Sequence, residues 1–160
     1  FLLFVFFLLN QSFANENIHL TKNNVVVIKD TIDDQSVSQV IYKLNKMKNK
    51  SDVFIYLDTP GGSVESGNRL LMEIQKYNLS CIADRAYSMG FVLLQGCKTR
   101  YIRQYGRIMQ HQISYGVKGE KGKIDSYQQF IHQLEDDLVT IQANRVKLTP
   151  QEFRYKTMNE

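Results

Sequence analysis

The sequence predicts an α/β fold built on a parallel sheet. Short apolar runs alternate along the chain with longer segments whose apolar residues repeat at helical spacing. Strands that are joined by helices form crossover units, and such units place their strands parallel in one sheet. A length of 160 residues with 43% hydrophobic residues suits one domain with a substantial core. We find no internal repeat and no interdomain linker.

Five short apolar runs predict the strands. They are rich in residues that favour extended chain, and turn or polar residues bound them. In chain order the predicted strands cover residues 23–28, residues 53–57, residues 79–84, the surroundings of 101–102 and those of 108–109.

Helices are predicted between and after these runs. The first carries a single apolar stripe, and the third is apolar nearly all round, so that we expect it to be central. A long helix is predicted from about Ile124 to Val146. In chain order the helices begin at an N-cap formed by Asp33 or Asp34, after the Gly61-Gly62 turn, at Ser88, at about Ile124 and at Pro150 behind an N-cap Thr149. Residues 113–123 hold three glycines and three lysines without periodicity and predict a flexible loop.

The first residues have the pattern of an export signal. Residues 1–9 are continuously apolar but too short to span a bilayer as a helix. A polar stretch follows, with small residues at Ser12 and Ala14, as at a signal-peptide cleavage site. We therefore expect a signal-peptide-like segment at 1–14, a folded domain at 15–160 that continues beyond a truncated end, and an exported, periplasmic protein. A buried first strand or an uncleaved anchor, in a cytoplasmic or membrane-anchored protein, is the alternative.

Charge and cysteines exclude some classes of function. The net charge is +4, but the densest basic run, Lys43 to Lys50, ends an amphipathic helix and lacks interleaved aromatic residues, so we do not expect nucleic-acid binding. Cys81 falls in a predicted buried strand and Cys97 at the end of a helix. We expect two buried free thiols, although the spacing leaves a disulfide open. We expect no metal and no organic cofactor.

Two glycine-bearing turns carry the candidate chemistry. Residues 60–64 (Pro-Gly-Gly-Ser-Val) and residues 87–90 (Tyr-Ser-Met-Gly) each follow an apolar run, and His111 ends another. Sharp turns from strand to helix leave backbone N–H groups that can bind an oxyanion. A hydroxyl, an imidazole and two such donors are the components of acyl transfer. Taken singly, each has a structural explanation: a serine at a helix start is usually an N-cap, and Pro-Gly-Gly is usually a turn.

In this order and spacing, four segments resemble the Clp protease proteolytic subunit family over about residues 23–160. The segments cover residues 30–34, 60–64, 87–90 and 107–112. The resemblance implies a ClpP/crotonase-like fold, which is a spiral of β-β-α units with a long handle-type helix. It also implies a serine endopeptidase that cleaves peptides or unfolded proteins without a cofactor.

The resemblance assigns the roles of individual residues. Ser88 would be the nucleophile and His111 the general base, with the backbone N–H groups of Gly62 and Met89 as the oxyanion hole. Glu160 stands near the spacing of the family's catalytic acid, which otherwise lies beyond the end of this chain. Peptide substrate would lie along a sheet edge, with contacts from Gly61, Ser63, Gln112 and Ile113. Ile113 departs from the family, which commonly has proline there.

Partners and competing functions follow from the same resemblance. We expect a homo-oligomeric ring, and the apolar stripe at 127–141 is either an oligomer interface or core packing. An AAA+ unfoldase partner is doubtful for an exported chain, because Clp ATPases are cytosolic. A Ser/Lys protease of the signal-peptide-peptidase type stays open but lacks a lysine in a comparable motif. A degenerate, peptide-binding member that has lost its acid also stays open.

Overall fold

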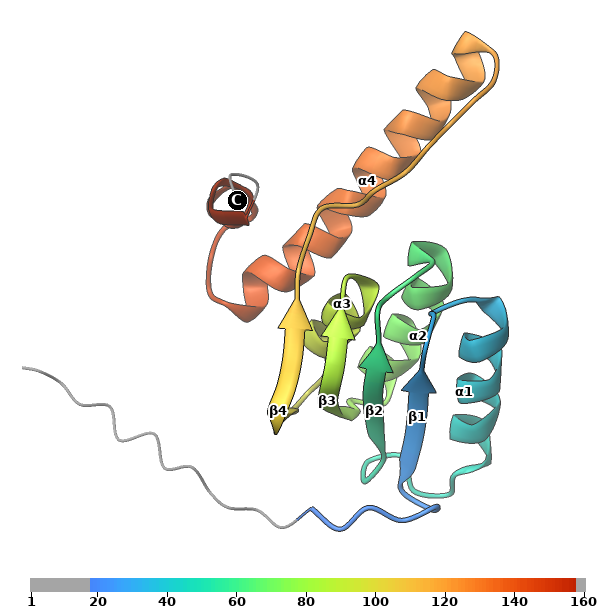
Figure 1. Cartoon of the computed structure of the whole chain (residues 1–160), viewed down its shortest axis with the longest axis vertical. Helices are drawn as coiled ribbons and strands as arrows, with labels where there is room; N and C mark the ends of the chain where they lie inside the picture. Colours follow the sequence, from blue (N-terminus) through green and yellow to red (C-terminus); the bar gives the residue numbers. More distant parts are fainter. Residues whose placement is uncertain (1–17, 158–160) are drawn as a thin grey trace, which may run out of the picture.

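The computed structural model describes residues 18–157 and shows one parallel sheet with a helix after each strand (Figure 1). Within these residues the sheet has four strands in the order β1-β2-β3-β4. The strands are β1 (Val25–Lys29), β2 (Phe54–Thr59), β3 (Ser80–Tyr87) and β4 (Arg100–Met109). The helices are α1 (Asp34–Lys46), α2 (Val64–Lys76), α3 (Met89–Gly96), α4 (Lys121–Arg145) and α5 (Pro150–Thr157). The predicted α/β class and the long helix are confirmed.

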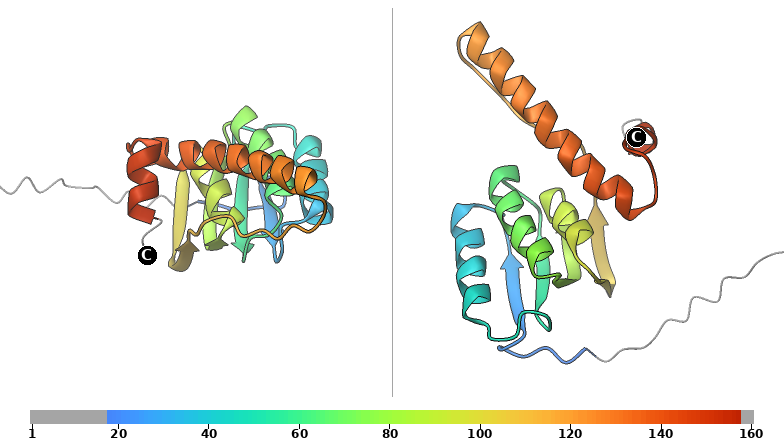
Figure 2. Two further views of the ribbon diagram at one scale, coloured as in Figure 1. Left: turned by 90° about the horizontal axis from the view of Figure 1, so that it is seen from above. Right: turned by 180° about the vertical axis from the view of Figure 1, so that it is seen from behind.

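The helices α1, α2 and α3 cover one face of the sheet (Figure 2). Alternate strand residues point to this face and are buried, as Ile28, Ile55 and Leu57 show. They meet apolar side chains of the helices in one continuous core. A fully buried side chain of this size contributes roughly 1.5–3 kcal/mol relative to an exposed one. This layer fixes the strand ends from which the functional turns emerge.

Local capping signals are confirmed at two helices. Asp33 is the N-cap of α1, and its carboxylate accepts a hydrogen bond from the Ser36 backbone N–H at 2.8 Å. That bond lowers the pKa of the Asp33 carboxyl. At α5, the Thr149 hydroxyl accepts from the Glu152 backbone N–H, and the Glu152 carboxylate accepts from the Thr149 backbone N–H at 2.8 Å. Both helices therefore start where the sequence predicts.

The two short strands predicted around 101–102 and 108–109 form one continuous strand, β4. Its pairing with β3 is interrupted by a register shift, so that Ala83 pairs with Ile102 but Arg85 pairs with Arg107. Gly106 lies in this bulge, where a Cβ atom would stand 2.7 Å from the carbonyl oxygen of Ala83. The strand passes this point because glycine allows the close approach. The prediction of two strands was therefore wrong.

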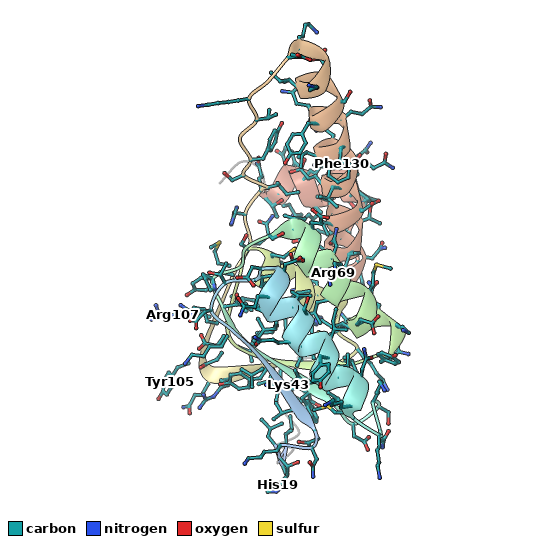
Figure 3. The ribbon with its side chains drawn as sticks, turned by 90° about the vertical axis from the view of Figure 1, so that its right-hand side faces the viewer. His19, Lys43, Arg69, Tyr105, Arg107 and Phe130 are labelled. Carbon is teal, nitrogen blue, oxygen red and sulfur yellow. A yellow bond between two sulfur atoms is a disulfide. The ribbon has the colours of Figure 1, made fainter. Side chains whose placement is uncertain are left out.

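The long helix α4 extends well beyond the sheet, and residues 113–120 run back along it without a helix or strand (Figure 1). Its predicted apolar stripe divides in two. Leu138 is buried in the core, whereas Tyr127 is 39% and Phe130 56% exposed. Phe130 lies on the extending part of the helix (Figure 3). Packing against the main core thus explains the C-terminal half of the stripe, while in the other half Ile131 is buried outside that core and two aromatic residues stay exposed. Within residues 18–157, no helix is both long and apolar enough to cross a membrane.

Cys81 and Cys97 form a disulfide, which corrects the expectation of two free thiols. The chain leaves α3 and returns beside the start of β3, because the Lys98 N–H donates to the Leu79 carbonyl and the Cys81 N–H donates to the Thr99 carbonyl. This return brings the two Cα atoms to 5.8 Å, within the range for a disulfide. The spacing in sequence could not show this meeting. The closed loop contains β3 from its second residue onward, Ser88 and all of α3.

Loss of this disulfide is expected to destabilise the fold. Closing a loop of 16 residues lowers the entropy of the unfolded chain, and the stabilisation is about 3 kcal/mol. The Cys81→Ala/Cys97→Ala variant should therefore unfold at a Tm lower by roughly 6–12 °C. Thermal unfolding with and without dithiothreitol measures this. Wild type should lose stability in reductant while the variant does not respond. Two titratable thiols in the unfolded, unreduced wild type would contradict the assignment.

Candidate active site

Ser88 lies at the sharp turn between β3 and α3. Its backbone has φ +53° and ψ −120°, a conformation that is strained for a residue with a side chain. The Ser88 N–H donates to the Met109 carbonyl at 2.8 Å and ties the turn to the end of β4. Although Ser88 occupies the N-cap position, its side chain makes no capping hydrogen bond. The structural explanation of this serine as a helix cap therefore fails, and its hydroxyl is available for chemistry.

The Gly61-Gly62 turn packs directly against Ser88. A Cβ atom on Gly61 would lie 2.7 Å from the Ser88 Cβ and 3.1 Å from the Met89 nitrogen. Both glycines have positive φ, +98° and +150°. The Ile32 N–H donates to the Gly61 carbonyl at 2.9 Å, so the loop after β1 supports the turn from behind. Glycine is thus required here by both conformation and space.

Two backbone N–H groups at these turns are left for a ligand. Two hydrogen bonds join the loop at Ile32 to the glycine turn. The Ile32 N–H donates to the Gly61 carbonyl, and the Ser63 N–H donates to the Ile32 carbonyl, so neither bond uses the Gly62 N–H. Within residues 18–157 no hydrogen-bond acceptor is found for that N–H. Met89 begins α3, so its N–H is among the four that have no acceptor inside a helix. The arrangement can bind an oxyanion next to Ser88.

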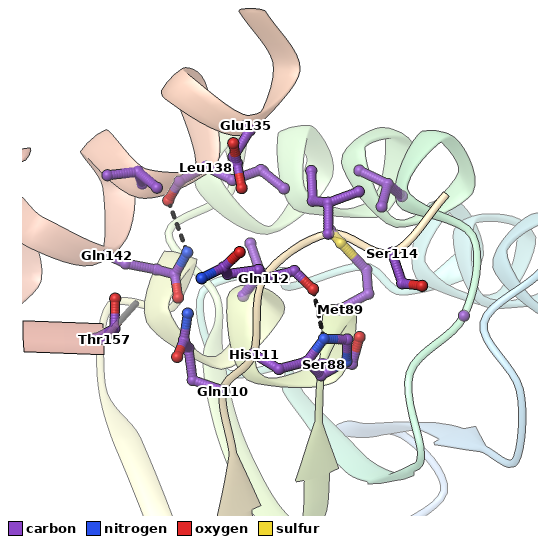
Figure 4. Close-up of a pocket in the computed structure, with 15 residues that line it drawn as sticks. Ser88, Met89, Gln110, His111, Gln112, Ser114, Glu135, Leu138, Gln142 and Thr157 are labelled. Atoms are coloured by element: carbon purple, nitrogen blue, oxygen red, sulfur yellow. Dashed lines mark hydrogen bonds between the residues drawn. The ribbon is translucent and has the colours of Figure 1, made fainter. Parts of the chain in front are cut away.

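His111 follows β4 and lines the same pocket as Ser88 (Figure 4). Its Nδ1 lies 2.5 Å from the Gln112 carbonyl oxygen. A carbonyl accepts only, so this contact places the proton on Nδ1 and leaves Nε2 as an acceptor. Within the described part of the chain, no hydrogen bond joins Ser88 and His111. Such bonds are often long before substrate binds.

A pocket of about 250 Å³ opens beside the serine (Figure 4). The glycine turn, the serine turn and residues 110–114 form one side of it, and α4 forms the other. The α4 side chains at the pocket are spaced as one face of a helix: Glu135, Leu138, Val139 and Gln142. Sequence reasoning did not assign this wall. The signal was present in the helical stripe, but nothing local shows which neighbour the stripe meets.

Comparison with known proteins gives the family. Residues 10–160 match the sequence model of the Clp protease family. The chain belongs to the Clp protease family. It is similar to the ATP-dependent Clp protease proteolytic subunit 1 of Bacillus cereus (strain ATCC 10987 / NRS 248), with 31% identity over 137 residues, 79% of this chain and 69% of the relative. Clp protease family members form oligomeric rings and bind protein substrates. The predicted family and its fold class are confirmed, and the chain is a peptidase of the ClpP type.

The structure of this Clp protease brings most of the predicted site residues together. The residues that line the pocket are Gly62, Ser88, Met89, His111, Gln112 and Ile113. Gly61 lies behind Ser88 rather than in the lining. Ser63 caps α2, with its hydroxyl 3.2 Å from the Ser66 nitrogen, which is a structural role that the prediction of substrate contact did not include. Glu160 lies outside the described residues. Residues 18–157 hold no cluster of side chains that could bind a metal.

Proposed function

We propose that this Clp protease is a serine endopeptidase that cleaves peptides or unfolded proteins through an acyl-enzyme. One observation carries the proposal. Ser88 has a strained backbone and an uncapped hydroxyl, and it stands beside two N–H groups, those of Gly62 and Met89, that are left for a ligand. A serine that merely started a helix would use its hydroxyl as the cap, as Ser63 does.

The proposed reaction follows from this arrangement. Ser88 Oγ attacks the carbonyl carbon of the scissile bond, and His111 Nε2 takes the hydroxyl proton. The carbonyl oxygen becomes negative and accepts hydrogen bonds from the two N–H groups, each worth about 3–4 kcal/mol in the transition state. When the C–N bond breaks, His111 returns its proton to the leaving amine. Water then hydrolyses the ester, with His111 again as base.

The catalytic acid and the course of the substrate belong to the same proposal. An acid that replaced the Gln112 carbonyl on His111 Nδ1 would hold the same tautomer and stabilise the imidazolium, and we assign it to Glu160 or to a residue that follows it. Among the described residues, the Gln112 carbonyl is bonded to His111 Nδ1, and the backbone of 113–116 and the Gln112 N–H have no hydrogen-bond partner. An extended peptide can therefore pair with Gln112 and Ile113, beside the glycine turn.

We also propose that the protein is exported to the periplasm and assembles into a ring. The Cys81–Cys97 disulfide supports export, because disulfides persist in oxidising compartments. The exposed Tyr127 and Phe130 on the extending half of α4 support assembly, since a partner would cover them. An exported enzyme works without an ATP-driven unfoldase, on chains that are already unfolded.

Labelling of the protein with a fluorophosphonate probe tests the proposed function. The phosphorus forms a bond to an activated serine oxygen, so wild type should be labelled and Ser88→Ala should not. His111→Ala should label at least about a hundredfold more slowly, because a base contributes about 10²–10⁴-fold. Ser126→Ala and His132→Ala, at exposed positions of α4, are the matched controls. Folded wild type that resists the probe would favour a peptide-binding member. Full labelling of His111→Ala would favour a lysine base.

A further inference from the structure

Gln142 places an unpartnered acceptor in the wall of the pocket. Its side chain is buried, with 5% of the residue exposed, and it lines the pocket from α4 (Figure 4). Its Nε2 donates to the Leu138 carbonyl at 3.0 Å. A carbonyl accepts only, so this bond fixes which end of the amide is the oxygen. Among the described residues the buried Oε1 has no hydrogen-bond partner. A buried acceptor without a donor is costly, and a ligand that carries a donor would satisfy it.

The charges near this wall favour a positive ligand group. Glu135 lines the pocket from the same face of α4 as Gln142, about two turns away. Its carboxylate lies 3.4 Å from the Arg154 guanidinium, and the same guanidinium also binds Asp136. One cation therefore serves two carboxylates, which leaves this cluster with a net charge of about −1. The cluster attracts a cation and repels an anion.

Part of the lining is apolar and is suited to an aliphatic stem. Met89, Val92 and Leu138 contribute apolar surface between the serine turn and α4. A side chain that enters beside Ser88 would lie among these residues, and the Gln142 side chain and Glu135 line the same pocket. The volume of about 250 Å³ accommodates a long, unbranched side chain.

We propose that the pocket selects a residue with an aliphatic stem and a donating end, lysine above all, on the acyl side of the scissile bond. The inference rests on the proposed function, since it is the carbonyl attacked by Ser88 that presents this side chain to the pocket. Gln142 is the acceptor for the donor, and Glu135 supplies the preference for positive charge.

Four peptides that differ only at this residue test the inference. Lysine, glutamine, methionine and glutamate are all unbranched and of similar length. Their comparison therefore separates the effects of a hydrogen-bond donor, of the sign of the charge and of the aliphatic stem alone. The expected order of kcat/KM is lysine, glutamine, methionine, glutamate, with about a tenfold advantage of glutamine over methionine from the hydrogen bond. Active sites are counted by fluorophosphonate labelling, so that partly folded variants can be compared.

Two variants divide the effect between the two residues. Gln142→Leu removes the acceptor and should bring the glutamine-to-methionine ratio close to one. Glu135→Gln removes the charge and should lower the lysine-to-glutamine ratio about threefold to tenfold. Gln133→Leu and Asp137→Asn make the same chemical changes at exposed positions of α4 and should move neither ratio.

The results separate this inference from the proposed function. A labelled enzyme that cleaves after methionine as well as after lysine overturns the inference and leaves the peptidase intact. The inference is also overturned if Gln142→Leu, with its rates normalised to labelled active sites, keeps the wild-type glutamine-to-methionine ratio of kcat/KM. A folded protein that neither labels nor cleaves any of the four peptides overturns both.

Discussion

Replacement of Ser88 by alanine is expected to lower kcat for peptide hydrolysis by about 10⁴–10⁶-fold. In the proposed mechanism the oxygen of this hydroxyl is the attacking atom, and the remaining oxyanion donors and binding contacts supply only the residual rate. His111→Ala should cost a similar factor, because the serine is a poor nucleophile without a base. The measurement is the steady-state rate on a peptide substrate, corrected for folded protein.

The double variant sharpens this result. Ser88→Ala/His111→Ala should be no slower than Ser88→Ala alone, because the two side chains act in one step. Ser126→Ala and His132→Ala repeat the same changes on exposed α4 positions and should keep the wild-type rate. If the two losses multiplied in the double variant, Ser88 and His111 would act independently, and the proposed acyl-transfer pair would have to be abandoned.

Replacement of Gly62 by alanine is expected to damage both the fold and the site. The new Cβ would lie 2.2 Å from the Ile32 carbonyl oxygen and 2.9 Å from the Ile32 nitrogen, and backbone atoms cannot yield as a flexible side chain can. The conformation at φ +150° adds strain of about 1–3 kcal/mol, and the clash adds about 1–3 kcal/mol more. A shift of the turn would also misplace the Gly62 N–H, at a cost of about 10²–10³ in kcat.

Gly116→Ala is the matched control for this experiment. No atom lies within 4 Å of the position of a Cβ there, and its φ is not in the positive range. We expect its stability to stay within about 0.5 kcal/mol of wild type. Urea unfolding and kcat on a peptide substrate measure the two effects. An alanine at 62 that folds and works like wild type would show that this turn does not form the oxyanion hole.

The residues that could be predicted from the sequence are those whose signals are local. Asp33 and Thr149 begin helices because their side chains bond to backbone amides three residues further along the chain. The serine and glycine turns were located because each follows an apolar run directly. The family resemblance supplied what the local signals could not, which is that Ser88 and His111 belong to one site.

The features that were missed depend on contacts between distant segments. The disulfide forms because the chain returns from α3 to β3, and two cysteines in a buried strand and a helix end give no sign of that return. Gln142 lies at the pocket because α4 crosses beside α3, although the sequence shows only that it shares a helical face with Leu138. The bulge at Gly106 looked like a break between two strands. The sequence pattern cannot show whether a strand ends at such a point or continues after a local shift in its pairing.

The strands lie in the sheet in the same order as along the chain. This order determines at which stage of folding the proposed catalytic groups come together. Each βα unit can dock on the one before it, so the fold can grow from its N-terminal end as the chain emerges into the compartment where it folds. The serine and the oxyanion donors are complete once α3 is in place, but the base arrives with the end of β4 and the pocket wall with α4. A chain that has folded only as far as α3 therefore carries the proposed nucleophile without its proposed base. In the proposed mechanism, proteolytic capacity appears only after β4 and α4 have folded.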